Sequence, residues 1–183
     1  GGMTMCFFEK ALEFIFLPCC GVCGKLGESY LCKKCGKELE KYVVYSQEET
    51  IKLHVFQYKD LVRKLILDYK FNDKSYLYKT FCEFIVKNKK ILDFIKSYDI
   101  IIPVPMHPAR IRKRGYNQSA LLAKELAKSL EMKVYTNVLL KIKNNKVQST
   151  LNKKEREENT KNVYKLVKPE KIKNKKILLL DDI

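Results

Sequence analysis

A short run of isoleucines constrains the fold of this chain more than any other feature. Ile100, Ile101 and Ile102 form an uninterrupted β-branched stretch, which is typical of a strand buried on both faces of a parallel sheet. Pro103 and Pro105 follow at once and predict the strand's end, because proline cannot donate a hydrogen bond to a neighbouring strand. A strand of this kind predicts an α/β fold in which helices cover a parallel sheet.

Arginines concentrate directly after this strand. Three of the chain's five arginines are Arg110, Arg112 and Arg114, whereas most of its other cations are lysines. The guanidinium group is a rigid fork that matches phosphate or carboxylate oxygens. A helix expected at 119–130 would add backbone N–H donors at its N-terminus. The pattern predicts a site for an anion, most simply phosphate, at the carboxyl end of a central strand. The alternative is a solvated basic loop.

Two Cys-x-x-Cys pairs precede this region, and a glycine follows each pair. Thiolates at this spacing can hold one metal ion from a tight turn, and the glycine lets backbone N–H groups approach the sulfur atoms. Four thiolates complete the tetrahedral shell of a structural zinc site. The predicted ligands are Cys20, Cys23, Cys32 and Cys35.

Other interpretations of the cysteines are weaker. Disulfides are unfavourable in a chain without a secretion signal, and a redox Cys-x-x-Cys usually occurs singly. Buried free thiols would not explain the doubled spacing. Cys19 leaves the first ligand open, because a Cys19/Cys23 pair is an alternative register. Cys6 and Cys82 lie in apolar helical surroundings and are interpreted as packing residues.

Apolar periodicity and turn residues predict the remaining elements. An amphipathic helix is expected over 5–17, and Asn152 with Glu155 resembles a capping box that opens a helix to about 161. Residues 143–150 have no apolar period and predict a polar loop. The other expected helices are 59–69, 75–87 and 91–97, and the other expected strands are 51–56, 133–142 and 177–180.

Paired carboxylates, Asp181 and Asp182, end the last apolar run. Such a pair is costly beside a buried strand unless it binds something. It could accept sugar hydroxyls, bind magnesium or stabilise a developing cation, and the alternatives are a simple helix cap or solvation of the chain end.

Net charge and hydropathy bear on partners and location. The formal net charge of +16 favours polyanion binding, although lysine is abundant throughout and no single basic stripe is evident. No stretch is long and apolar enough to span a membrane, and no secretory leader is recognisable, so we expect a cytoplasmic protein without membrane insertion.

Taken together, these motifs resemble the ComF family, competence-associated proteins of the type I phosphoribosyltransferase fold with an N-terminal zinc ribbon. The resemblance covers nearly all of residues 12–183. It rests on the cysteine pairs, on YKDLVRKLILDYKF (58–71), on PVPMHPARIRKRGYNQ (103–118), and on ILLLDD (177–182). Gln148, Leu151, Arg156 and Asn159 also match the family's Q..L....R..N pattern.

The resemblance implies roles for individual residues. Asp181 and Asp182 match the acidic pair that holds the ribose hydroxyls of phosphoribosyl pyrophosphate (PRPP), and are the expected catalytic residues. Residues 105–114 match a loop that contacts pyrophosphate together with Mg²⁺, and 143–150 a flexible loop that closes over the site. The expected PRPP-binding residues are Pro105, His107, Arg110, Arg112, Arg114, Gly115, Asn117 and Gln118, and those of the flexible loop are Lys143, Lys146, Gln148 and Arg156.

The expected organisation is a tag remnant (1–2), a helix and zinc ribbon (3–41), and a phosphoribosyltransferase-like domain (42–183). That domain lacks the Thr/Gly-rich loop that follows the acidic pair in the family, so the chain looks truncated and is expected to bind PRPP poorly or not at all. The expected function is phosphoribosyl transfer or PRPP binding in DNA uptake, with an unknown acceptor. The alternatives are an adaptor that binds single-stranded DNA or docks the competence helicase, and a zinc-stabilised scaffold for protein–protein contacts.

Overall fold

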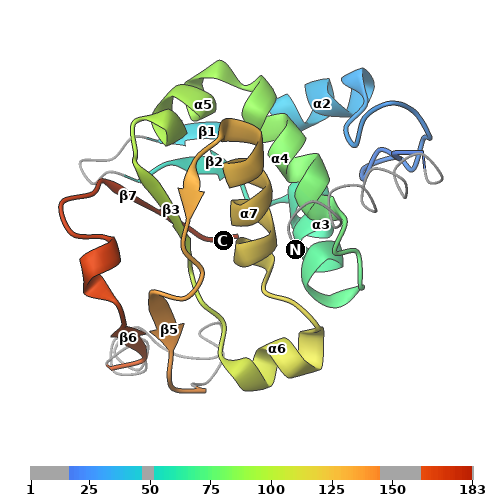
Figure 1. Ribbon diagram of the computed structural model, residues 1–183. Helices are drawn as coiled ribbons and strands as arrows, with labels where there is room; N and C mark the ends of the chain where they lie inside the picture. Colours follow the sequence, from blue (N-terminus) through green and yellow to red (C-terminus); the bar gives the residue numbers. More distant parts are fainter. Residues whose placement is uncertain (1–16, 47–51, 145–161, 183) are drawn as a thin grey trace.

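The computed structural model describes residues 17–46, 52–144 and 162–182. Figure 1 shows a mixed α/β body in which α7 lies across a small sheet and α6 lies near the β5–β6 hairpin. The elements are α2 (Lys33–Glu40), β1 (Val43–Ser46), β2 (His54–Phe56), α3 (Asp60–Phe71), α4 (Leu77–Lys87), α5 (Lys89–Lys96), β3 (Ile100–Pro103), α6 (Pro108–Arg114), α7 (Gln118–Leu130), β4 (Lys133–Val134), β5 (Leu139–Lys141), β6 (Tyr164–Leu166), the 3-10 helix η2 (Pro169–Lys171) and β7 (Ile177–Leu180).

The isoleucine run forms the central strand of a parallel sheet, as the sequence predicts. β3 lies between β4 and β7 and is parallel to both, with Ile100 opposite Lys133 and Ile177, and Pro103 opposite Leu180. All four β3 residues are buried. The carboxyl ends of β3 and β7 therefore lie side by side.

Helices cover this sheet because each carries one apolar face. α7 packs against β3 and α4, and α4 packs against α5. Leu122 and Leu126 of α7 meet Phe81 and Ile85 of α4 in the main apolar core. The predicted helices at 59–69, 75–87, 91–97 and 119–130 are confirmed to within a few residues.

The predicted strand at 133–142 is divided in two. β4 ends at Val134, and residues 136–138 turn the chain away before β5 begins. Asn137 is a poor strand former and a good turn former, which favours the division. β5 then pairs antiparallel with β6, a strand that periodicity does not predict.

The arginine segment is a helix and not the loop expected from the sequence. The His107 ring accepts the Ala109 N–H at the N-terminus of α6, and Pro108 occupies the first turn. Gly115 ends the helix at φ 88°, a left-handed conformation that favours glycine. The prediction of a loop is therefore wrong for Pro108–Arg114.

Residues 5–16 of the predicted helix at 5–17, the predicted helix at 152–161 and Ile51 of the predicted strand 51–56 lie outside the described residues. Within the described ranges, no helix has the length and apolar character that a membrane span needs.

Candidate functional site

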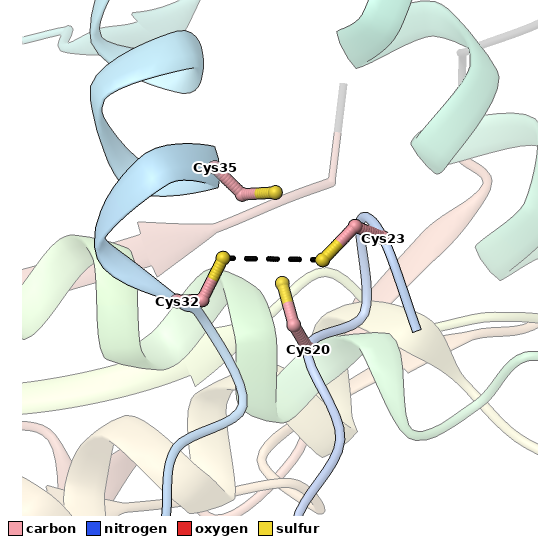
Figure 2. A group of neighbouring side chains, drawn as sticks. All are labelled: Cys20, Cys23, Cys32 and Cys35. Atoms are coloured by element: carbon pink, nitrogen blue, oxygen red, sulfur yellow. Dashed lines mark hydrogen bonds between the residues drawn. The ribbon is translucent and has the colours of Figure 1, made fainter. Parts of the chain in front are cut away.

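The two cysteine pairs converge on one point. The Sγ atoms of Cys20, Cys23, Cys32 and Cys35 all lie within 4.8 Å of one another, and Cys23 and Cys32 are 3.9 Å apart. Figure 2 shows all four side chains directed into the space between them, two from a tight loop and two from the start of α2. Tetrahedral zinc with bonds of about 2.3 Å needs sulfur atoms about 3.8 Å apart. The cluster could therefore hold a metal ion such as zinc.

Local backbone geometry brings the first pair to this point. The Gly24 N–H donates to the Cys20 carbonyl at 2.7 Å, and Gly24 has φ 73°, so the turn needs a residue that tolerates left-handed backbone. Cys32 is the N-cap of α2 and Cys35 lies in its first turn, where the helix dipole favours thiolates.

Hydrogen bonds prepare the Cys20 thiol for metal binding. Burial alone would raise its pKa, but the backbone N–H groups of Cys32, Cys23 and Val22 lower the pKa to about 7. The pKa of the Cys35 thiol shifts in the opposite direction without a metal. Burial raises it most, and the neighbouring cysteines raise it further. Cys19 instead forms a β-bridge with Leu26 and is not in the cluster, which favours the Cys20 register.

The acidic pair lies where β7 leaves the sheet. Val104 N–H donates to the Leu180 carbonyl at 2.8 Å, so the Asp181–Asp182 segment begins beside the exit of β3. The Ser119 hydroxyl, in the first turn of α7, donates to Asp181 Oδ1 at 3.0 Å. The carboxyl ends of two parallel strands and the N-terminus of a helix therefore meet at the carboxylates.

The two carboxylates have different environments. Asp182 forms an ion pair with Lys70 of α3 at 2.9 Å, with both side chains less than a fifth exposed. Asp181 retains solvent access, yet desolvation and the neighbouring Asp182 carboxylate raise its pKa to about 6. Lys70 and Ser119 are site residues that the sequence reasoning missed. Lys70 lies within the family-like segment 58–71, but nothing in that segment indicates an ion pair with Asp182.

The arginines of α6 differ in exposure. Arg112 is exposed, and Arg110 is half-buried and donates to Asn144 Oδ1 at 3.3 Å. Arg114 lies over the Phe71 ring, 5.1 Å from its centroid. Burial lowers the Arg114 pKa, and the Asp182 charge opposes that effect. Arg114 therefore contributes to packing as well as to charge.

Other predicted site residues build the frame of the site. Asn117 accepts the Ala120 N–H at the start of α7, and its amide donates to the Val104 carbonyl at 3.1 Å. Gln118 is buried, and its carbonyl accepts from the Tyr69 hydroxyl at 2.8 Å. His107 and Gly115 terminate α6, and Pro105 lies between β3 and α6.

The β5–β6 hairpin adds two residues that the sequence did not indicate. The Lys141 ammonium lies 5.6 Å from the centroid of the Tyr164 ring. Burial and the Arg110 charge lower the Lys141 pKa, whereas burial and the Asp181 charge raise the Tyr164 pKa. These influences place the hairpin near both α6 and the acidic pair. Lys143 is exposed beyond β5, and Lys146, Gln148 and Arg156 lie outside the described residues.

A cavity of about 360 Å³ borders the acidic pair, and Asp181 and Asp182 are among its lining residues. Phe56, Tyr69, Phe81 and Leu122 are among its mostly apolar walls, and no residue of α6 lines it. Phosphate oxygens would find few partners there.

Comparison with known proteins gives one informative similarity. The chain is 29% identical to competence protein F of Haemophilus influenzae over 176 residues, which is 90% of this chain and 77% of that protein. No protein-family model and no solved structure matches it. The sequence similarity over most of both chains, together with a cysteine cluster suited to a zinc ribbon, supports the resemblance to the ComF family.

Proposed function

We propose that this chain binds PRPP or a related phosphorylated sugar together with Mg²⁺, in a site between the acidic pair and α6, and that it takes part in DNA uptake. The relative's name, competence protein F, supports the cellular role. The motif resemblance to type I phosphoribosyltransferases supports the ligand.

One observation carries the proposal. Asp181 and Asp182 lie at the carboxyl end of β7, and the neighbouring strand β3 leads directly into the arginine helix α6. A sugar diphosphate has hydroxyl groups at one end and strongly anionic oxygens at the other. Carboxylates that accept from hydroxyls, next to guanidinium groups that pair with phosphate, complement both ends.

Each part of the site would have a defined task. Asp181 and Asp182 would accept hydrogen bonds from the ribose hydroxyls. Arg110 and Arg112 would neutralise the pyrophosphate oxygens. Mg²⁺ bound with the ligand would neutralise further phosphate charge. Lys70 and Ser119 would hold the carboxylates in place.

The test is calorimetric titration of Mg²⁺–PRPP, with Mg²⁺–pyrophosphate as a second titrant. We expect Mg²⁺–pyrophosphate to bind, and Mg²⁺–PRPP to bind weakly. The Asp181→Asn variant should weaken PRPP more than pyrophosphate, because only PRPP offers ribose hydroxyls. The Arg110→Gln/Arg112→Gln variant should weaken both. No heat from either titrant, or equal losses for both titrants in every variant, would contradict the proposed arrangement.

We assign zinc as the metal of the cysteine cluster, because four thiolates at tetrahedral spacing favour it. Metal analysis of protein purified without chelator should give one zinc per chain. Cys20→Ser and Cys32→Ser should each lose that zinc, whereas Cys19→Ser should retain it. Full zinc content in the Cys20→Ser variant would show that the first ligand is wrong.

Single-stranded nucleic acid is a second candidate ligand. Phe71 is 65% exposed and lies beneath the Arg114 guanidinium, a combination suited to base stacking beside a phosphate contact. The net charge of +16 favours such binding. Fluorescence anisotropy with a labelled oligonucleotide should show affinity that falls steeply with salt and falls further in Phe71→Ala. Salt-insensitive binding, or no binding, would exclude this function.

A further inference from the structure

Tyr30 is the point at which the cysteine cluster meets the rest of the protein. Tyr30 lies between the two cysteine pairs in the sequence. Its backbone forms hydrogen bonds both to the cysteine loop and to α4. The carbonyl accepts from Gly21 N–H at 3.1 Å and from the Thr80 hydroxyl at 3.0 Å. Its N–H donates to the Glu83 carboxylate at 2.7 Å. Residues 80 and 83 are both on α4, so one face of that helix holds the peptide units of Tyr30.

The packing at this contact is close. Thr80 is completely buried, and a Cβ on Gly21 would lie 2.2 Å from the Thr80 hydroxyl oxygen. The Glu83 side chain is 20% exposed and also pairs with Lys87. The loop that carries Cys20 therefore has little freedom to shift relative to α4.

The same loop sets the geometry at sulfur. Cys20, Cys23 and Cys32 carry three of the four sulfur atoms that lie within 4.8 Å of one another. These three residues lie within two positions of Gly21 or Tyr30, which α4 contacts directly. Groups that orient the immediate surroundings of a metal ligand commonly change metal affinity about 10- to 100-fold.

We propose that Thr80 and Glu83 are positioning residues of the metal centre, and that metal binding is coupled through them to the docking of α4. This proposal rests on the zinc assignment above. Neither side chain touches the metal. They fix Tyr30 and Gly21, and through them the backbone that surrounds the thiolates. Coupling is reciprocal, so zinc must also stabilise the position of α4.

The apolar core extends this coupling beyond one contact. Cys20, Leu31 and Cys35 are buried in the same cluster as Leu77 and Phe81 of α4. The metal centre is thus an extension of the main core. In a separate, tethered zinc module, metal binding and the docking of α4 would not be coupled.

The experiment measures zinc retention in competition with a chromogenic chelator. Glu83→Ala should lose zinc about 10-fold or more readily than the unmodified protein, and Thr80→Val should show a smaller loss. Glu83→Gln keeps an acceptor for the Tyr30 N–H and should largely restore retention. Lys87→Gln is the matched control, because it removes only the ion pair on the solvent side of Glu83 and should leave zinc retention unchanged.

Hydrogen exchange supplies the reciprocal readout. Zinc removal from the unmodified protein should accelerate amide exchange in residues 77–87. A smaller acceleration is expected in Glu83→Gln only if that variant also retains zinc less well than the unmodified protein. Unchanged zinc retention in both Glu83→Ala and Thr80→Val would overturn this proposal while leaving the zinc assignment intact. A protein that binds no zinc at all would overturn both.

Discussion

Asp181 and Asp182 are adjacent in sequence, but their carboxylates have different charged neighbours. Asp182 has a cationic partner in Lys70, at 2.9 Å in a poorly exposed environment. Asp181 has the Ser119 hydroxyl and a like-charged neighbour, and its pKa rises to about 6. The native state therefore holds the Asp181 proton more tightly than the unfolded chain does. Ionisation of Asp181 consequently opposes folding.

Substitution of each aspartate should reveal this difference. Asp182→Asn leaves Lys70 without its counter-charge and should lower the free energy of unfolding by roughly 1–3 kcal/mol at pH 7.5, below the cost of breaking a fully buried pair. Asp181→Asn should raise stability slightly at pH 7.5, because the stability that a proton on Asp181 confers is lost as pH rises from about 4 through 6. At pH 4 the effect of Asp181→Asn should vanish. Denaturant unfolding at both pH values provides the measurement, and equal effects of the two substitutions would contradict this account.

The helix α6 shows what residue patterns predict and what they omit. The three arginines predict a cationic segment after β3, and the structure places them there. The helix itself was missed, because it is short and has no buried residue to set an apolar period. His107 and Gly115, which the family resemblance implies as ligand-binding residues, begin and end the helix. Lys70 and Ser119 were missed for another reason: their link to the acidic pair depends on packing between segments distant in sequence.

Arginine substitutions on α6 should separate binding from stability. Arg112→Gln should weaken Mg²⁺–pyrophosphate binding and leave the melting temperature within about 1 °C, because an exposed side chain contributes little to folding. Arg114→Gln should weaken binding and also lower stability by about 0.5–1 kcal/mol, because it removes the contact with Phe71. Parallel calorimetry and thermal unfolding would measure both effects. An unchanged affinity in both variants would mean that α6 is only a solvated basic surface.

The loop that carries Cys20 can pack closely against α4 because Gly21 has no side chain. Gly21→Ala would place a methyl group 2.2 Å from the Thr80 hydroxyl and 2.6 Å from Leu77 Cδ2. Since Thr80 and Leu77 are fully buried, the clash should cost about 1–3 kcal/mol. Gly27→Ala is the control, because a Cβ there meets nothing within 4 Å. Equal unfolding free energies for the two variants would show that the loop does not pack against α4 as described.

At the scale of the whole molecule, two sites lie on one continuous core. The cysteine cluster joins the core at α4, α4 packs against α7, and the first turn of α7 holds Asp181 through Ser119. Doubled Cys-x-x-Cys spacing and the ILLLDD run predict the two sites separately. Their connection through α4 and α7 could not be predicted, because it depends on which faces of the helices meet.

Chelation of the metal should therefore affect more than the cysteine loop. A zinc-free protein should melt at a lower temperature than the zinc-loaded protein, and in one transition if the core is shared. Differential scanning calorimetry with and without chelator measures this. Two separate transitions, with only the smaller one sensitive to chelator, would show that the two parts unfold independently.

The most direct test of the central claim is hydrogen exchange in the presence and absence of Mg²⁺–PRPP. A ligand bound between the acidic pair and α6 should slow exchange at residues 104–119 and at the end of β7, and leave α5 and β2 unchanged. Protection confined to β2, α5 and the other walls of the apolar cavity, or no protection at saturating ligand, would contradict the proposed site.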